Sequence, residues 1–253
     1  MNIILITQNE PFYLRDSISY LIKNLPKGCK IGGVILLQTS PFGKKLNKLQ
    51  KGFSTLNIFG IKFTLYYLIR LILTKINGRS VEKFLLNRKI PIIKLDESIN
   101  SPSSIIKISN YRPDLMISIQ GNEIFKKPII NLAPNGCLNL HTALLPKYRG
   151  LMPSFWVLKN GEKKTGVSVF FVDEGIDSGP IFIQREVFIN NMTQAQLIKL
   201  TKRVGMECII EAINKIINGD ISTIPNDDRN MTYFGFPEKK DVAEFRKRGA
   251  KFF

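Results

Sequence analysis

Residues 137–150 read CLNLHTALLPKYRG, an apolar strand followed by an irregular loop. Alternate residues of a strand share one face, so Asn139 and His141 point to one side while Leu138 and Leu140 point into the other layer. The strand is apolar enough to lie inside a sheet, and its polar pair stands toward its C-terminal end. Open parallel sheets bind ligands at that edge.

The segments before this strand alternate between strand and helix. Apolar runs predict strands at 2–7, 30–37, 90–95, 115–119 and 137–141, and helical spacing predicts helices at 12–25, 44–76 and 81–87. Gly52 and Gly60 are expected to break the long helix into two pieces. Strands that alternate with helices predict an α/β fold with a mostly parallel sheet.

The pattern changes after residue 160. Strands are predicted at 165–172 and 181–188, and the eight residues between them are too few for a crossover helix. This pair is therefore expected to be antiparallel. Thr193 and Gln196 have the spacing of a helix-capping box, and helical periodicity continues from there to Gly219.

Composition narrows the class of protein. With 253 residues, of which 44% are hydrophobic and 23% charged, the chain can bury one large core. Its three cysteines are too scattered for a disulfide framework, and its single histidine excludes a His-rich metal centre. The first residues have no basic, apolar leader, so a signal peptide is not expected. We expect a reduced, cytoplasmic protein with no metal.

The charge balance is strongly basic. Lys and Arg number 37 against 20 Asp and Glu, a net charge of +17, and residues 41–92 hold eleven basic residues against one acid. Such an excess attracts nucleic acid, anionic lipid or phosphorylated small molecules. The ordinary alternative is a solvated basic surface.

Residues 59–73 form the most apolar part of that basic segment. Eleven of these fifteen residues are apolar or aromatic, but Lys62 and Arg70 make the uninterrupted run too short to span a bilayer. Lys62, Tyr66, Arg70 and Thr74 form a polar stripe along the predicted helix. The helix either packs into the protein, pairs with a second copy in a homodimer, or makes peripheral contact with the inner membrane face.

Candidate chemistry gathers around the strand at 137–141. His141 is the only imidazole of the chain, although an Asn and a His at this spacing are often just a cap and a satisfied surface side chain. Asp173 and Asp177 lie on a Gly-rich bend, where the usual role of an acid is an Asx turn. Cys137 shares the face of His141, but a cysteine in an apolar strand is expected to be buried and unreactive.

Four short sequences occur together in this region: NLH at 139–141, LLPKYRG at 144–150, TGVS at 165–168 and DSG at 177–179. Jointly they resemble the folate-dependent formyltransferase family, which includes methionyl-tRNA formyltransferase, glycinamide ribonucleotide formyltransferase and the sugar N-formyltransferases. The resemblance is good over 114–186 and holds elsewhere in broad pattern. It implies a Rossmann-like three-layer α/β fold whose sheet is mostly parallel, with an antiparallel strand near the C-terminal half.

The resemblance also implies a reaction. In this family a formyl group passes from 10-formyltetrahydrofolate to an amine. By resemblance, Asn139 and His141 donate to the oxyanion, and Asp177 supports the imidazole or accepts a proton. The resemblance implies a folate site lined by Glu123, Ile124, Phe125, Ala143, Leu144, Leu145, Pro146, Asp173, Glu174, Gly175 and Ile176. The chain departs from the family pattern at Thr142 and Ala143, where Pro or Gly followed by Ser is usual.

The acceptor and the domain organisation follow from the same comparison. The preferred acceptor is a nucleotide-linked amino sugar for surface polysaccharide, such as lipopolysaccharide, because the tail resembles that of the short sugar N-formyltransferases. Methionyl-tRNA is the alternative that the charge favours, and a non-catalytic basic module that binds membrane or nucleic acid is the alternative of another class. Residues 1–222 are expected to form the catalytic domain, with 41–92 as a helical insertion. Residues 223–253 are expected to form a short tail that packs on it.

Overall fold

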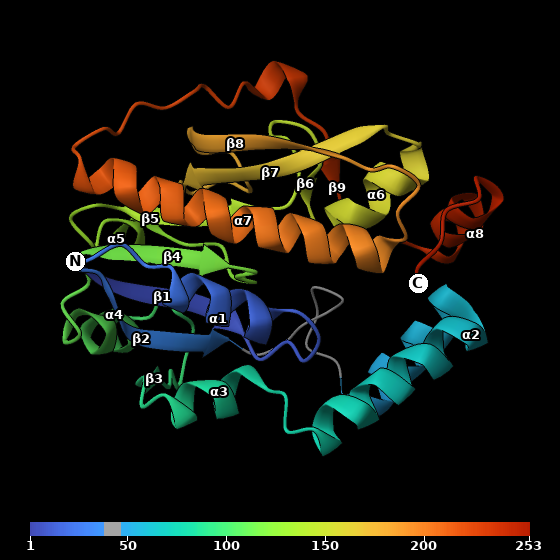
Figure 1. Ribbon diagram of the computed structural model, residues 1–253, viewed down its shortest axis with the longest axis horizontal. Helices are drawn as coiled ribbons and strands as arrows, with labels where there is room; N and C mark the ends of the chain where they lie inside the picture. The colour runs from blue at the N-terminus through green and yellow to red at the C-terminus, as the bar shows by residue number, and fades with distance from the viewer. Residues whose placement is uncertain (38–46) are drawn as a thin grey trace.

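The computed structural model describes residues 1–37 and 47–253. A seven-stranded sheet with the strand order β3-β2-β1-β4-β5-β7-β8 runs through these residues, and helices cover both of its faces (Figure 1). The strands are β1 (Asn2–Gln8), β2 (Lys30–Leu37), β3 (Ile92–Ile93), β4 (Leu115–Ile119), β5 (Cys137–His141), β7 (Lys164–Phe171) and β8 (Ile181–Phe188). The predicted three-layer α/β fold is confirmed.

The helices divide between the two faces. Helices α1 (Leu14–Lys23), α3 (Val81–Asn87) and α7 (Gln194–Ile217) share one buried cluster with the sheet, and α4 (Pro102–Ser109) and α5 (Lys127–Ile130) share the other. Strand β1 shows why two layers form: Ile3 and Leu5 belong to the first cluster, Ile4 and Ile6 to the second, and all four are fully buried. A strand that is apolar on both faces needs cover on both.

One strand runs against the others. β1, β2, β3, β4 and β5 are parallel, whereas β7 is antiparallel to both β5 and β8. The predicted antiparallel pair is therefore confirmed. This arrangement sets His141 of β5 directly opposite Ser168 of β7.

Helix α7 begins at the predicted capping box. The Thr193 side chain accepts from the Gln196 backbone N–H, and the Gln196 side chain accepts from the Thr193 backbone N–H. Gly205 lets this helix approach the sheet, because a Cβ there would lie only 2.6 Å from Cδ2 of Leu140. The helix therefore packs directly beneath the strand that carries Asn139 and His141.

The segment between β2 and β3 differs in part from its prediction. Helix α2 (Lys48–Ile76) is kinked at Gly60, whose φ of 76° and ψ of 174° are not helical, so that break is confirmed. The break at Gly52 is wrong: Gly52 lies within the helix, where glycine is permitted at a modest cost. The predicted residues 44–46 lie outside the described residues. The strand predicted at 90–95 is only Ile92–Ile93, at the edge of the sheet and next to Pro91, which has no N–H to donate.

The tail folds back over the end of β5. A small sheet joins β6 (Arg149–Gly150) to β9 (Tyr233–Phe234), and a 3₁₀ turn, η1 (Asp228–Asn230), precedes β9. Helix α8 (Lys239–Lys247) packs on α6 (Pro153–Asn160), and Phe245 stacks on Phe155 with ring centroids 4.9 Å apart. Phe234 stacks on Trp156 in the same way, at 4.7 Å. These two aromatic side chains of the tail, Phe234 and Phe245, thus pack on the protein.

Candidate active site

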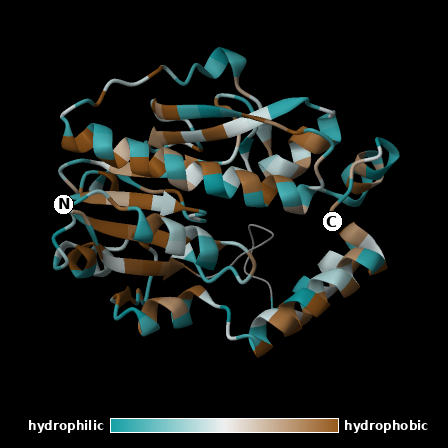
Figure 2. Cartoon of the chain, viewed as in Figure 1, coloured by the Kyte–Doolittle hydropathy of each residue, from teal (hydrophilic) through white to brown (hydrophobic). Residues whose placement is uncertain are grey.

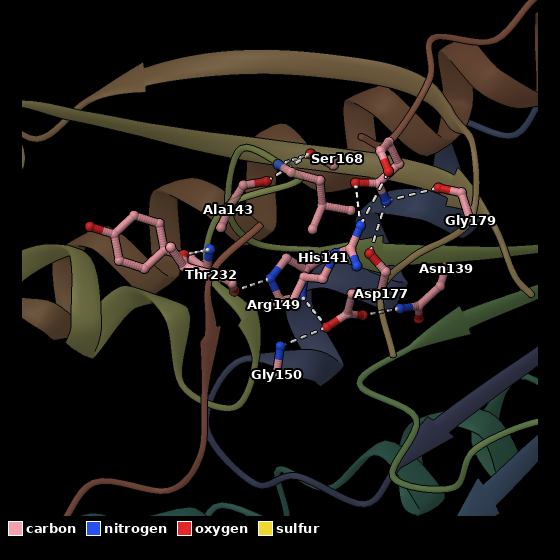
Figure 3. Close-up of polar contacts among 12 residues, drawn as sticks. Asn139, His141, Ala143, Arg149, Gly150, Ser168, Asp177, Gly179 and Thr232 are labelled. Carbon is pink, nitrogen blue, oxygen red and sulfur yellow. Dashed lines mark hydrogen bonds and ion pairs between the residues drawn. The ribbon is translucent and has the colours of Figure 1, made fainter. Parts of the chain in front are cut away.

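The structure brings Asn139, His141 and Asp177 together at the C-terminal end of β5 (Figure 3). The Nδ1 atom of His141 lies 3.5 Å from Oδ2 of Asp177, and Nδ2 of Asn139 lies 3.5 Å from its Oδ1. Asn139 and His141 come from the strand, whereas Asp177 comes from the bend between β7 and β8. The three side chains that the sequence proposed as catalytic therefore form one group.

The imidazole of His141 is fixed by a backbone carbonyl. Its Nε2 lies 2.7 Å from the carbonyl oxygen of Tyr148, and the side chain is buried. Because a carbonyl oxygen only accepts hydrogen bonds, Nε2 must carry a proton and donate it. The other ring nitrogen, Nδ1, faces the Asp177 carboxylate.

Asp177 is held in an unusual backbone conformation. Its φ is 50°, in the left-handed region, and its Oδ2 accepts from the Gly150 N–H at 2.8 Å. The Nδ2 group of Asn226 donates to the carbonyl oxygens of Asp177 and Gly179, both at 2.9 Å. Arg149 donates in turn to Oδ1 of Asn226 at 3.0 Å. The carboxylate is thus positioned by the loop after β5 and by the tail.

The loop at 143–146 is fixed by side chains from β7 and β8. Ser168 donates to the carbonyl of Ala143 at 2.8 Å and accepts from the Leu145 N–H at 3.1 Å. Gln184 donates to the Leu145 carbonyl at 2.9 Å. Leu144 lies against Gly166, where a Cβ would come within 2.4 Å of its Cδ2. The loop predicted to line a ligand site is therefore rigid, and Pro146 continues it, half-buried.

The residues predicted at 123–125 follow β4, the strand next to β5. Glu123 accepts from the Ser98 hydroxyl at 2.5 Å and from the Ile99 N–H at 3.2 Å. Phe125 is buried in the core, whereas Ile124 is 57% exposed. The side chains of Glu123 and Phe125 therefore hold this segment in place, and the structure does not bring them to Asn139.

The bend before Asp177 contains both an Asx turn and exposed groups. Oδ1 of Asp173 accepts from the Gly175 N–H at 3.1 Å and from the Ser178 hydroxyl at 2.7 Å. Glu174 lies 3.7 Å from the Lys127 ammonium, and Ile176 is exposed. Asp173 shapes the bend, as acids on such bends usually do, and only Asp177 reaches the histidine.

Four further residues support the site from a distance in sequence. Ser168 and Arg149 belong to the short sequences that carried the resemblance, so their importance was visible. Asn226 had no such signal, and neither had Thr232, whose Oγ1 accepts from the Tyr148 N–H at 2.8 Å. Both belong to the tail, and their roles depend on contacts between residues 49 and 84 positions apart in the sequence.

The neighbouring thiol is unreactive. Burial raises the pKa of Cys137 to about 12, and its side chain lies in the core on the side away from Leu138. A thiol with such a pKa is almost never a thiolate at neutral pH. Among residues 1–37 and 47–253, no group of three or more His, Cys, Asp or Glu side chains is arranged to hold a metal ion.

Comparison with known proteins now identifies the family. The profile of the formyl transferase family matches residues 85–213, about half of the chain, so the chain belongs to this family. The sequence is 39% identical over 146 residues to the methionyl-tRNA formyltransferase of Thermodesulfovibrio yellowstonii, covering 57% of this chain and 47% of that one. It is 34% identical over 161 residues to the methionyl-tRNA formyltransferase of Clostridium novyi, covering 63% and 52%. The matches span about half the length of these relatives.

Solved structures show the same fold at lower identity. The phosphoribosylglycinamide formyltransferase of Bacillus halodurans superposes with a TM-score of 0.60 at 18% identity, over 85% of this chain and 95% of that one. The N-formyltransferase of Helicobacter canadensis, solved with folinic acid and dTDP-3-aminofucose, gives 0.58 at 21% identity, over 92% and 70%. A sugar N-formyltransferase from a Shewanella species gives 0.60 at 16% identity, over 93% and 76%.

Proposed function

We propose that the chain is an enzyme that transfers a formyl group from 10-formyltetrahydrofolate to a primary amine. The observation that carries this proposal is the group formed by Asn139, His141 and Asp177 at the C-terminal end of β5, the edge at which open parallel sheets bind ligands. Membership of the formyl transferase family supports it.

The three side chains match the needs of this transfer. The amine nitrogen attacks the formyl carbon, the carbonyl becomes an oxyanion, and the bond to N10 of the folate then breaks. The Nδ2 group of Asn139 has two hydrogens, of which one faces Asp177 and the other is available to the oxyanion. When Nδ1 of His141 is protonated, it donates a hydrogen bond to the oxyanion. The carboxylate of Asp177 stabilises the imidazolium that this protonation produces. The proton lost by the amine passes to N10 as that nitrogen leaves.

The folate is proposed to lie along the fixed loop at 143–146 and the bend at 173–176. Ser168 and Gln184 already fix the backbone of that loop, so it presents one shape to a flat ring. Ile176 and Ile124 are exposed and apolar, which suits stacking on a pterin. These residues supply binding, whereas the chemistry stays with Asn139, His141 and Asp177.

The first candidate acceptor is methionyl-tRNA. The named relatives at 34–39% identity are methionyl-tRNA formyltransferases, and the net charge of +17 suits a polyanion. The names of these relatives favour methionyl-tRNA, the alternative acceptor, over the nucleotide-linked amino sugar that the sequence led us to prefer. A tRNA substrate predicts that the apparent affinity falls steeply with rising salt, because binding releases counterions from phosphates.

A nucleotide-linked amino sugar remains the second candidate. The observation that favours it is the extent of the match: the fold of the sugar N-formyltransferases covers 92–93% of this chain, including part of the tail. A small acceptor predicts little response of KM to moderate salt. The product would then be a formylated amino sugar used to build surface polysaccharide, including lipopolysaccharide.

The experiment uses both acceptors side by side. The purified chain is supplied with 10-formyltetrahydrofolate and either methionyl-tRNA or a panel of nucleotide-linked amino sugars, and the formylated product is detected by its added mass. Product from tRNA that disappears with salt supports the first candidate, and product from a sugar supports the second. No product from any amine overturns the enzyme proposal and leaves a non-catalytic basic module.

The same proposal covers the organisation of the chain. We propose that residues 1–222 form the catalytic unit, with 41–92 inserted, and that the tail at 223–253 completes it. Support comes from Asn226 and Thr232 of the tail, which bond to the loops that hold His141 and Asp177. We place the enzyme in the cytoplasm.

A further inference from the structure

Helix α2 is turned with its apolar side outward. After the kink at Gly60, seven aliphatic side chains are 47–74% exposed: Ile61, Leu65, Leu68, Ile69, Ile72, Leu73 and Ile76. At about 100° per residue they fall in one arc of about 140°. Figure 2 shows hydrophobic colour along this helix, which lies at the edge of the molecule.

The polar side of the same helix faces the protein. Arg70 donates to the hydroxyl of Tyr13 at 3.0 Å, and its guanidinium lies 4.4 Å from the centroid of the Phe12 ring. Tyr66 stacks on Phe253 with ring centroids 3.9 Å apart, and Thr74 is half-buried. Three residues of the predicted polar stripe, Tyr66, Arg70 and Thr74, thus lie on the packed side, whereas the fourth, Lys62, is exposed. This is the reverse of an ordinary surface helix, which buries its apolar face.

The contacts with the tail fix this orientation. Phe63 packs edge-on against Phe252 at 4.9 Å, and Arg246 of α8 donates to the carbonyl of Phe59, beside the kink. Rotating the helix to hide its aliphatic face would break these contacts and those of Arg70. The exposed face is therefore a fixed feature of the fold.

The length of the helix after the kink suits an interfacial helix better than a membrane-spanning one. By length and composition alone, the stretch from Leu49 to Asn87 is apolar enough to cross a membrane, with 6% of the most apolar window buried. The kink at Gly60, however, leaves residues 61–76, which extend about 24 Å against the ~30 Å of a hydrocarbon core. One side of that piece is also packed on the protein. The geometry suits a helix that lies in the plane of a membrane surface.

The charges near this face favour an anionic lipid surface over a second copy of the chain. Lys62 and Lys75 are exposed beside the aliphatic face, and the sequence has no Asp or Glu between Lys48 and Ser80. In a pair formed by two copies of this face, the ammonium groups of one copy would meet no carboxylate from residues 49–79 of the other, so charge would not favour the pair. An anionic lipid surface complements both the apolar arc and the basic residues.

We propose that the outer face of α2, residues 61–76, docks on an anionic lipid bilayer and holds the enzyme at the membrane surface. The aliphatic side chains enter the acyl boundary, and the ammonium groups of Lys62 and Lys75 meet lipid phosphates. Neither the reaction nor the identity of its acceptor enters this argument. Its test is therefore separate from that of formyl transfer.

The test is co-sedimentation of the full chain with vesicles. One set is phosphatidylcholine alone, and the other is phosphatidylcholine mixed with phosphatidylglycerol, each at low and at physiological salt. The triple variant Leu65→Gln/Ile69→Gln/Ile72→Gln removes apolar contact from the centre of the face. The matched control Ile106→Gln/Ile221→Gln changes aliphatic side chains of 63% and 65% exposure on other parts of the surface.

We expect the wild type to bind the anionic vesicles, more strongly at low salt, and to bind phosphatidylcholine weakly. The triple variant should bind at least about tenfold less well, while the control binds as the wild type does. Circular dichroism and the thermal melting temperature verify that each variant is folded. A wild type that stays in the supernatant at both salt concentrations overturns the proposal, as does a triple variant that still binds. A stable dimer without vesicle binding, dissociated by the triple variant, overturns it in favour of a second copy.

Discussion

The imidazole of His141 lies between a carbonyl oxygen and a carboxylate, with one ring nitrogen facing each. The Tyr148 carbonyl accepts from Nε2, and the Asp177 carboxylate faces Nδ1. The side chain of Asp177 is kept in place by the Gly150 N–H, and its backbone by Asn226. At the scale of residues, the proposed chemistry therefore depends on one ring and on the groups that orient its partner.

Replacement of His141 tests that dependence. His141→Asn should lower kcat roughly 100-fold or more, because a donor to the oxyanion is lost while the side chain still fits a polar site. The matched variant Cys137→Ala changes the buried thiol on the same face of β5 and should keep near-normal kcat. A formyl thioester on Cys137, detected by mass, would contradict this division of roles.

Asn226 is predicted to be a positioning residue. Asn226→Ala frees the carbonyls of Asp177 and Gly179, so the carboxylate should lose its fixed distance to His141 and kcat should fall about tenfold, with a shifted pH profile of kcat. The control is Asn214→Ala, on the exposed side of α7. An unchanged pH profile together with a lower melting temperature would show a purely structural role.

Lys202 makes stability depend on pH. Burial lowers its pKa to about 8, and Glu10 offsets part of that effect. Between about pH 8 and the ordinary lysine pKa of 10.5, the unfolded chain binds more protons than the folded chain, so the free energy of unfolding rises with pH. Lys202→Met should stabilise the protein at pH 7 by on the order of 3 kcal/mol and remove that rise.

Urea unfolding between pH 7 and pH 11 measures this effect. The control is Lys199→Met on the same helix, where the side chain is exposed and the pH dependence should match that of the wild type. A Lys202→Met variant that is less stable than the wild type at pH 7 would show that the ammonium makes a favourable contact in the folded state.

At the scale of elements, the sequence predicted those strands and helices whose bounds are determined by local apolar patterns and capping residues. Strands β4 and β5 and helix α3 have the predicted bounds, because each is a short apolar or periodic run between clear turn residues. Helix α7 was marked by its capping box. Strand alternation predicted that Asn139 and His141 share one face of β5, and the resemblance to the formyltransferase family supplied their expected roles.

Other elements depend on contacts that a pattern does not contain. Helix α6 begins after Met152 in a left-handed conformation, and β6 and β9 are two residues each and exist only as a pair. Gly52 and Gly60 look alike in sequence, but only Gly60 lies where α2 turns toward α8. The direction of the polar stripe on α2 was equally undetermined, because it is set by Tyr13 and Phe253, far away in sequence.

The packing of α8 should account for much of the stability of the tail. Phe245 is fully buried and stacks on Phe155 and on Phe252, so Phe245→Ala should lower the free energy of unfolding by about 3–5 kcal/mol. Phe188→Ala, at a ring that is 63% exposed on β8, is the matched control and should change it little. Equal losses for the two variants, measured in urea, would contradict the packing described here.

At the scale of the whole molecule, charge and exposed apolar surface point to two different partners. The net charge of +17 suits a polyanionic acceptor or an anionic surface, and α2 presents its aliphatic face beside basic residues. The site at the end of β5 is built from different elements than that face. Membrane docking and formyl transfer are therefore separable, and each has its own variants.

The central claim is that this chain transfers a formyl group by means of the side chains at the end of β5. The most direct measurement follows the mass of the acceptor amine after incubation with 10-formyltetrahydrofolate, for the wild type and for folded His141→Asn protein. We predict that the wild type adds one formyl group to methionyl-tRNA or to a nucleotide-linked amino sugar, and that His141→Asn does so roughly 100-fold more slowly. Equal rates for the two proteins, or no formylated product from any acceptor with the wild type, would contradict the claim.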